Sequence, residues 1–390
     1  MFAYISRRLL LMIPTILGIM LISFTIIQFA PGGPVERIIA QLQGIDTNAT
    51  SRIGGGGGDL GQSGGAAGGG GGDATSRYRG AQGLDPKFIA ELEKQFGFDK
   101  PAYERFWLML TNYTCKRADP ASPGRTSLFK IGPLECVDLG KSYFRDTSVI
   151  RLIGEKLPVS ISLGVWMTLL SYMISIPLGI AKAVRDGSRF DVWTSGVIII
   201  GYAIPSFLFA ILLVVLFAGG SFWQIFPLRG LTSENFDTLS LGAKILDYAW
   251  HMVLPITAMV LGAFATSTFL TKNSFLEEIR KQYVQTARMK GLSERQVLYG
   301  HVFRNAMMIV VAGFPGAFVH AFFTGSLLIE NIFSLDGLGL LSYESILNRD
   351  YPVVFGNLFI FALLGLVVNL LSDLTYTWID PRIDFETRDV

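Results

Sequence analysis

The stretch AWHMVLPITAMVLGAFATSTFLT, residues Ala249–Thr271, decides the fold class of this 390-residue chain. It contains no Asp, Glu, Lys or Arg, and an α-helix needs about 20 mostly apolar residues to cross the ~30 Å hydrocarbon core of a bilayer. The whole chain agrees, because 50% of its residues are hydrophobic, only 16% are charged and its mean hydropathy is +0.44. Soluble domains carry about 25% charged residues, so most of this chain is expected to contact lipid.

Five other stretches are equally long and free of these charged residues. The six predicted spans are Leu9–Ala30, Leu157–Ala181, Val192–Ala218, Ala249–Thr271, Ala306–Ile329 and Val353–Leu371. The first span follows two arginines, as in a signal peptide, but it is longer than the usual apolar region and ends in a poor cleavage site. We therefore predict an all-α membrane protein with six transmembrane helices, the first of them an anchor.

Prolines interrupt the predicted spans. They are Pro14, Pro158, Pro177, Pro205, Pro255 and Pro315. A proline inside a helix removes a backbone hydrogen bond and favours a kink, yet membrane helices tolerate proline because the freed carbonyls find other partners. Simple tolerance and a bundle built to open and close both remain compatible with this pattern.

The basic residues of the short loops predict the orientation, since such loops carry more Lys and Arg on the cytoplasmic side. With the N-terminus inside, the cytoplasmic segments contain Arg7, Arg8, Lys182, Arg185, Arg189, Lys272, Arg280, Lys281, Arg288, Lys290, Arg295, Arg304, Arg382 and Arg388. The two short external loops contain only Arg229, Lys244 and Arg349. Both termini are therefore predicted to be cytoplasmic, in residues 1–30 and in the tail after the last span.

Residues 31–156 form a large predicted external insertion between the first two spans. Residues 54–72 are mostly glycine, which predicts a flexible loop. Pro86 follows the potential N-cap Asp85 and predicts the start of a helix with Phe88, Leu92 and Phe96 on one face and Gly97 at its end. A second amphipathic helix is predicted over Tyr103–Tyr113.

Both cysteines of the chain, Cys115 and Cys136, fall in this insertion. In an oxidising compartment they would most simply form one disulfide. Two free thiols are the alternative.

The segment Lys272–Arg304 is the most informative for function. Apolar residues recur at helical spacing up to Ala287, Gly291 ends that pattern, and Ser293 with Gln296 predicts a capping box on a second helix. A DNA-binding helix–turn–helix would look similar, but here both ends run into membrane spans. We therefore expect a docking element for a cytoplasmic protein, which would contact the apolar face at Tyr283 and Ala287. We expect no nucleic-acid partner, since the net charge is only +2.

The sequence lacks the residues that several other classes of function require. The spans contain no acid of the kind an ion-coupled carrier buries, the chain has no Walker lysine motif, and it has no His-Glu-x-x-His or Gly-x-Ser-x-Gly signature of an enzyme. Ser206 is interpreted as a helix-packing hydroxyl. With three histidines and two cysteines, no metal site is expected. A receptor or scaffold that passes no substrate remains open.

Several motifs resemble one known family. Gln285-Thr286-Ala287 with Gly291 resembles the EAA motif of the permease subunits of bacterial ABC importers, with Gln-Thr-Ala in place of Glu-Ala-Ala. Thr286–Gly291 (TARMKG) and His301–Asn305 (HVFRN) are similar to the oligopeptide, dipeptide and nickel branch. Further matches are Ala30–Pro34, Leu84–Pro86, Asp138–Ser142, Leu157–Ser160, Phe333–Gly339, Arg349–Pro352 and Asp380–Ile383. Gly201–Pro205 and Leu270–Leu276 resemble the B-type permeases of microcin C and oligopeptide importers.

This resemblance implies a type I (MetI-like) permease fold, with a core domain over residues 157–390, in the bacterial inner membrane. It implies a heterodimer with a paralogous C-type permease, cytoplasmic ATPase subunits that carry ATP and Mg, and a periplasmic peptide-binding protein. The chain itself would hold no cofactor and no catalytic residue. The coupling loop would present Tyr283, Gln285, Thr286, Ala287, Arg288, Lys290 and Gly291. The expected function is ATP-driven oligopeptide import; a nickel or other small-solute permease and an ion-coupled carrier are the alternatives. The substrate-binding residues stay unassigned.

Overall fold

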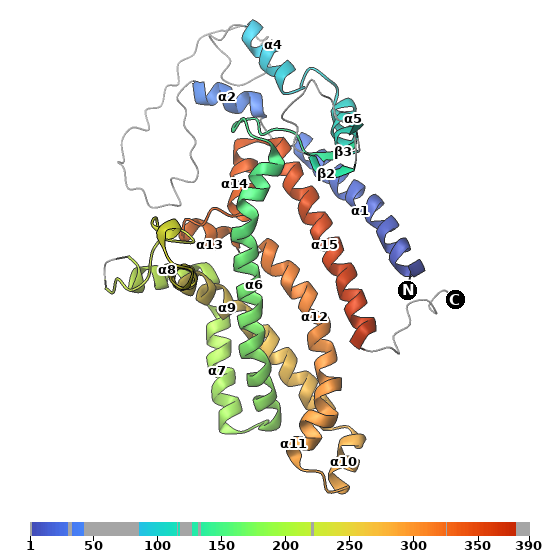
Figure 1. Ribbon diagram of the computed structural model, residues 1–390, viewed down its shortest axis with the longest axis vertical. Helices are drawn as coiled ribbons and strands as arrows, with labels where there is room; N and C mark the ends of the chain where they lie inside the picture. Colours follow the sequence, from blue (N-terminus) through green and yellow to red (C-terminus); the bar gives the residue numbers. More distant parts are fainter. Residues whose placement is uncertain are drawn as a thin grey trace, which may run out of the picture. The chain divides into compact units, whose positions relative to one another are not determined.

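The computed structural model describes residues 2–29, 33–42, 86–114, 116–117, 127–131, 134–219, 222–324 and 326–379 (Figure 1). The glycine-rich stretch 54–72 lies outside the described residues. Five described stretches are long and apolar enough to cross a membrane: Tyr4–Phe29, Val149–Val184, Leu241–Ile279, Glu294–Phe318 and Tyr351–Thr375. A bent pair of shorter helices brings the number to six when the pair is counted as one broken span. The predicted helical membrane fold is thereby confirmed.

The span predicted over Val192–Ala218 differs from its prediction. Residues 192–218 were expected to form one helix, but α7 (Arg189–Ala203) and α8 (Ser206–Phe217) meet at an angle of 92°. Ile204 is extended, with φ −85° and ψ 119°, because the ring of Pro205 disfavours helical backbone in the residue before it. Pro205 also has no N–H with which to continue the ladder of α7.

The other helices differ mainly in length. They are α1 (Phe2–Phe29), α6 (Val149–Val184), α9 (Leu241–Ile279), α12 (Phe303–Thr324) and α15 (Tyr351–Ile379). Hydropathy marks only the lipid-facing part of a helix, so α6 and α9 extend well beyond the predicted spans. The predicted span Ala306–Ile329 is too long, because α12 ends at Thr324 and a separate helix, α13 (Ser326–Ile332), follows. Helix α14 (Leu338–Asn348) was not predicted.

The insertion contains more regular structure than the sequence indicated. Its described helices include α2 (Pro34–Leu42), α4 (Pro86–Gln95) and α5 (Ala102–Asn112). An unpredicted antiparallel sheet has the order β1-β3-β2, from β1 (Lys116–Arg117), β2 (Ser127–Ile131) and β3 (Leu134–Asp138). Cys136 lies in β3, but Cys115 lies outside the described residues, so the disulfide stays a prediction.

Helix α4 begins at Pro86 and is followed by Gly97 at φ +72°, as predicted. Its buried face is partly different from the predicted one. Leu92 and Phe96 pack against Val35 and Ile39 of α2, with Ile89 beside them, whereas Phe88 is 38% exposed. The heptad spacing of Ile89 and Phe96 places the apolar stripe one position further along the helix than expected.

The chain divides into two compact units. The first, called here the bundle unit, comprises the described residues within Met1–Ile13, Lys156–Leu340 and Phe361–Val390. The second, called the insertion unit, comprises those within Pro14–Glu155 and Leu341–Ile360. The bundle unit has a core in which side chains of α6, α8, α9 and α13 meet, including Leu163, Leu213, Met259 and Ile329.

Candidate functional site

The segment between α9 and α12 folds as the sequence predicts. Helix α10 (Gln282–Met289) is followed by Gly291 at φ +83°, a backbone conformation that glycine adopts without strain. Helix α11 (Glu294–Val297) begins with a capping box in which Ser293 and Gln296 bond to each other's backbone N–H groups. A π-helical turn, Leu298–Val302, then leads into α12. In Figure 1 α10 and α11 lie at the tip of the bundle unit.

The apolar face of α10 points inward. Val284 is fully buried and Ala287 is 7% exposed, and both belong to a cluster with Ile180 of α6, Phe275 of α9 and Val302 before α12. This corrects the interpretation of that face as the contact with a partner protein, because the chain's own helices already cover it. Periodicity predicts that a face is buried, but it does not say which surface buries it.

The residues predicted for this loop therefore divide into three groups. Ala287 is buried, Tyr283 and Arg288 are half-buried, and Gln285, Thr286, Lys290 and Gly291 are exposed. The outward face also carries Met289, which is 81% exposed. Single exposed apolar side chains are common on protein surfaces, so Met289 counts here only as part of this outward face.

Tyr283 connects α10 to its neighbours. Its hydroxyl donates to Glu278 Oε2 of α9 at 2.7 Å and accepts from Asn305 Nδ2 of α12 at 3.2 Å. Burial, reinforced by the carboxylate of Glu278, raises the pKa of the Tyr283 hydroxyl. The neutral hydroxyl thus holds α10 against the ends of both long helices.

A buried charge cluster lies near this end of the bundle unit. Lys182 of α6 is fully buried, and its Nζ lies 3.0 Å from Asp191 Oδ1 of α7. The same ammonium donates to the Thr194 and Ser195 hydroxyls at 2.8 and 2.7 Å. Lys272 of α9 donates to Asp191 Oδ2 at 2.7 Å. Three helices are therefore joined through one carboxylate.

Sequence reasoning treated Lys182 and Lys272 only as basic residues of cytoplasmic loops. The cluster was missed because its burial depends on how α6, α7 and α9 pack. The one available signal was Asp191, an acid directly before an apolar span and within ten residues of a lysine directly after another.

A second buried carboxylate, that of Glu330, lies beside Ser160 near the start of α6. Glu330 of α13 has no exposed surface. Its Oε2 accepts the N–H of Leu340 at 2.7 Å, and its Oε1 accepts the hydroxyl of Ser160 at 3.2 Å. The Ser160 hydroxyl accepts the N–H of Leu338 at 2.8 Å. Glu330 and Ser160 together satisfy N–H groups of the first turn of α14, which otherwise lack intrahelical partners.

A cavity of about 650 Å³ lies between α6, α7, α8, α9 and α12 of the bundle unit, and is called here the bundle cavity. Its polar lining consists of hydroxyl groups from Thr168, Ser171, Tyr172, Tyr202, Ser206, Thr266 and Ser267. Its remaining lining is apolar, from Met167, Met259, Gly262, Ala263, Gly316 and Ala317. Ser206, interpreted from the sequence as a helix-packing hydroxyl, thus lines a cavity.

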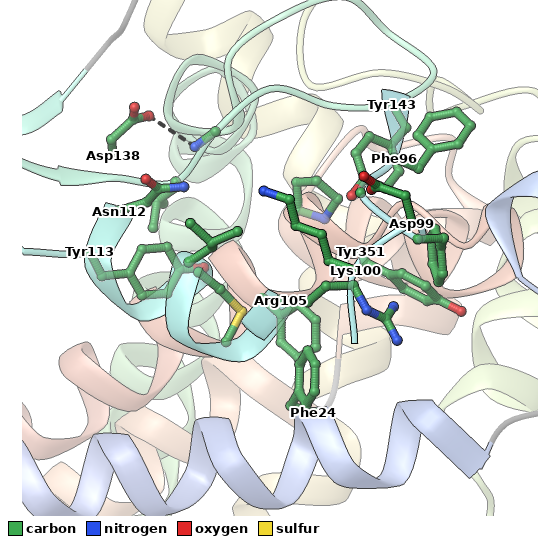
Figure 2. Close-up of a pocket in the computed structure, with 18 of the residues that line it drawn as sticks. Phe24, Phe96, Asp99, Lys100, Arg105, Asn112, Tyr113, Asp138, Tyr143 and Tyr351 are labelled. Atoms are coloured by element: carbon green, nitrogen blue, oxygen red, sulfur yellow. Dashed lines mark hydrogen bonds between the residues drawn. The ribbon is translucent and has the colours of Figure 1, made fainter. Parts of the chain in front are cut away.

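The insertion unit has a different cavity, of about 500 Å³, lined by aromatic and charged side chains. Figure 2 shows Lys100 reaching toward its middle, with Phe24, Tyr113 and Tyr351 among the surrounding groups. The Arg105 guanidinium lies over the ring of Phe98, 4.5 Å from its centre, and donates to Gln28 Oε1 at 2.7 Å. In this unit the sequence motifs Asp138–Ser142 and Arg349–Pro352 meet, because the Ser142 hydroxyl and the Tyr143 N–H donate to Asp350.

Known proteins place these features in a family. The family described as binding-protein-dependent transport system inner membrane component matches residues 175–385. The chain belongs to this family. Over its whole length it is 66% identical to the full-length peptidoglycan transport system permease protein YejB of Agrobacterium fabrum. It is 55% identical, over 99% of the chain and all of the relative, to the inner membrane ABC transporter permease protein YejB of Escherichia coli O157:H7.

A more distant relative is the oligopeptide transport system permease protein AppB of Bacillus subtilis, 31% identical over 99% of this chain and all of AppB. The chain is thus a multi-pass inner-membrane permease of the ABC importer type. The family match includes α10, the charge cluster and the bundle cavity lining from α7, α8, α9 and α12, so these are features of the permease core. The lining residues of α6, Thr168 among them, precede the matched range. Among the described residues, no group of three or more His, Cys, Asp or Glu is arranged to hold a metal ion.

Proposed function

We propose that this permease is one of two paralogous membrane subunits of an importer that passes oligopeptides across the inner membrane, driven by ATP hydrolysis on separate cytoplasmic subunits. An external binding protein would deliver the peptide. The relatives belong to a peptidoglycan transport system and an oligopeptide transport system, which supports a peptide or peptidoglycan substrate. The observation that carries the proposal is the outward face of α10, because it offers a partner a surface that is fixed to three membrane helices.

That surface is formed by Gln285, Thr286 and Met289, with Lys290 and Gly291 at its edge. The opposite face of α10 packs into the cluster that includes Ile180 of α6 and Phe275 of α9. Close-packed interiors transmit displacement because they deform little. A push on the outward face by an ATPase subunit would therefore move the ends of α6 and α9, and with them the walls of the bundle cavity.

Both termini and α10 are proposed to be cytoplasmic, as the distribution of basic residues favours. ATP and Mg would be held by the partner ATPase subunits, and this chain would contribute no catalytic group. Gly291 is needed for the positive φ that ends α10, so a bulky residue there should disturb the outward face without reaching the bundle cavity.

The test uses the assembled importer, purified with its partner subunits and reconstituted in vesicles with the binding protein. Met289→Glu should remove the ATPase subunits from the complex, or lower peptide-stimulated ATP hydrolysis at least tenfold, because it charges an exposed apolar contact. The control is Leu241→Glu, which changes a side chain with similar exposure, 82%, at the start of α9. Equal ATPase recovery in both variants would overturn the docking assignment.

The transported substrate is tested in the same vesicles by ATP-dependent uptake of labelled peptides of three to five residues, with nickel uptake measured in parallel. Peptide uptake that stops without ATP would support the proposal. Nickel uptake without peptide uptake would favour the small-solute alternative, and uptake driven by an ion gradient without ATP would favour a carrier.

A further inference from the structure

Among the described residues that line the bundle cavity, none has a charged side chain, and all of the polar side chains carry hydroxyl groups. A hydroxyl both donates and accepts hydrogen bonds. Such a lining can bond to N–H and C=O groups alike and makes no choice between acidic and basic ligands. Its volume, about 650 Å³, is within the range of small-molecule sites.

One of these hydroxyls has no partner in the protein. Thr168 of α6 is 3% exposed, and its Oγ1 makes no hydrogen bond. Other buried threonines of the bundle unit bond to the carbonyl one turn earlier, as Thr268 does to Phe264 at 2.7 Å and Thr271 to Ser267 at 2.8 Å. A buried polar group without a partner is costly, so its presence in the cavity wall points to a ligand that supplies the bond.

The bend between α7 and α8 places the N-terminus of α8 at the same cavity. Tyr202 near the end of α7 and Ser206 at the start of the 12-residue helix α8 both line it. The N-cap position of α8 is Pro205, which makes no side-chain cap hydrogen bond. The first N–H groups of a helix lack intrahelical partners and carry partial positive charge. Broken membrane helices bind the anionic groups of substrates in this way.

We propose that the bundle cavity is a transport subsite for the main chain of a peptide, with the C-terminal carboxylate at the N-terminus of α8 and a main-chain amide bonded to Thr168. The inference rests on the proposed function and adds the residues that contact the peptide. Because the lining recognises groups that every peptide shares, side-chain charge has little influence on passage through this site.

The test compares variants of the complete importer in vesicles, with one binding protein and two labelled peptides of the same sequence. One peptide ends in a free carboxylate and the other in an amide. Ser206→Asp places a carboxylate at the α8 N-terminus, where it accepts hydrogen bonds from the free N–H groups and repels the C-terminal carboxylate of the peptide. It should lower the ratio of acid to amide uptake about tenfold relative to the wild type. The binding protein is the same throughout, so a change in the ratio reports the permease.

Thr168→Val keeps the shape of the side chain and removes only the hydroxyl. It should lower the uptake of both peptides about fivefold, and Thr168→Ser should restore most of it. The matched control is Thr257→Val on α9. Thr257 is exposed and does not line the bundle cavity, and its hydroxyl donates to the Val253 carbonyl at 2.6 Å. Uptake by this variant should be unchanged.

The outcomes separate the subsite from the proposed function. Two outcomes would overturn the subsite and leave peptide import intact, provided that the wild type takes up peptide. One is the same acid-to-amide ratio in Ser206→Asp as in the wild type, and the other is unchanged uptake in Thr168→Val. No ATP-dependent uptake of either peptide by the wild type would overturn both. Because Thr168→Val is nearly isosteric, it keeps the test decisive even where Ser206→Asp impairs assembly.

Discussion

The bundle unit contains two buried carboxylates that are held in different ways. Asp191 is held by the ammonium groups of Lys182 and Lys272, which come from two other helices. Glu330 accepts a backbone N–H from Leu340 and the hydroxyl of Ser160. Both clusters are attached to α6, at Lys182 and Ser160, and the stretch of α6 between these residues is about 33 Å long at helical rise, close to the thickness of the hydrocarbon core.

The difference indicates what each end of the bundle unit does. At Asp191, three helices are joined by charges, so their relative positions are fixed near α10. At Glu330, the carboxylate organises the turn between α13 and α14, so a local loop is fixed. Between the two, α6 contributes Thr168, Ser171 and Tyr172 to the bundle cavity, whose described lining residues are uncharged. The two buried carboxylates thus fasten helices at the two ends of this stretch of α6, with the bundle cavity between them.

The largest effect is expected for Asp191→Asn, which leaves Lys182 buried without its counter-charge. Removing one partner of a buried ion pair is strongly destabilising, by about 3 kcal/mol or more. The midpoint of thermal unfolding of the purified complex in detergent should fall markedly, and ATP hydrolysis should persist without peptide stimulation, because α10 would no longer move α6, α7 and α9 together.

The control for that variant is Asp186→Asn, since Asp186 also contacts Lys272 at 3.0 Å but is 36% exposed. Adding Lys182→Met to Asp191→Asn should recover part of the lost stability, because the uncompensated charge is then removed. If Asp191→Asn and Asp186→Asn lowered the unfolding midpoint equally, burial of the cluster would not be what fixes the helices.

Sequence alone predicted the features that depend on short-range signals. The spans follow from runs without charge, and the end of α10 and the start of α11 follow from Gly291 and the pair Ser293 and Gln296, because turns and caps are decided within a few residues. Pro205 indicated a kink in the sequence, but not a bend of 92° between α7 and α8, since the angle depends on what these helices pack against.

The features of the candidate site that sequence reasoning missed depend on how several helices pack together. The hydroxyls of the bundle cavity come from α6, α7, α8 and α9, and each of them alone is typical of helix packing. Lys182 and Lys272 look like ordinary flanking charges until packing places Asp191 between them. Likewise, the apolar face of α10 predicted burial, and only the fold shows that Ile180 and Phe275 cover it.

A second prediction concerns the Glu330 cluster. A Cβ on Gly337 would overlap the carboxyl group of Glu330, so Gly337→Ala should force the buried carboxylate away from its donors. Overpacking of this kind costs about 2 kcal/mol. The unfolding midpoint should fall less than in Asp191→Asn, and the control Gly196→Ala on α7, where a Cβ meets nothing within 4 Å, should leave it unchanged or raise it.

Unlike the Asp191 variant, Gly337→Ala should lower ATP hydrolysis and peptide uptake in proportion to the amount of folded complex. The reason is that Glu330 fixes a turn and is not linked to α10 by any of the contacts described above. Peptide-independent ATP hydrolysis in Gly337→Ala would show that both carboxylates serve coupling, and the distinction between the two ends would be lost.

The smallest effect is expected for Arg280→Gln. Arg280 lies at the end of α9 and approaches Asp186 at 3.4 Å, but its side chain is 69% exposed. Exposed ion pairs contribute about 0.5 kcal/mol or less, since water and salt screen them. Unfolding midpoints of wild type and Arg280→Gln should therefore differ only slightly, and that difference should vanish at high salt, whereas the deficit of Asp191→Asn should remain. A large, salt-insensitive effect of Arg280→Gln would extend the fixed region beyond the buried cluster to the surface charges around α10.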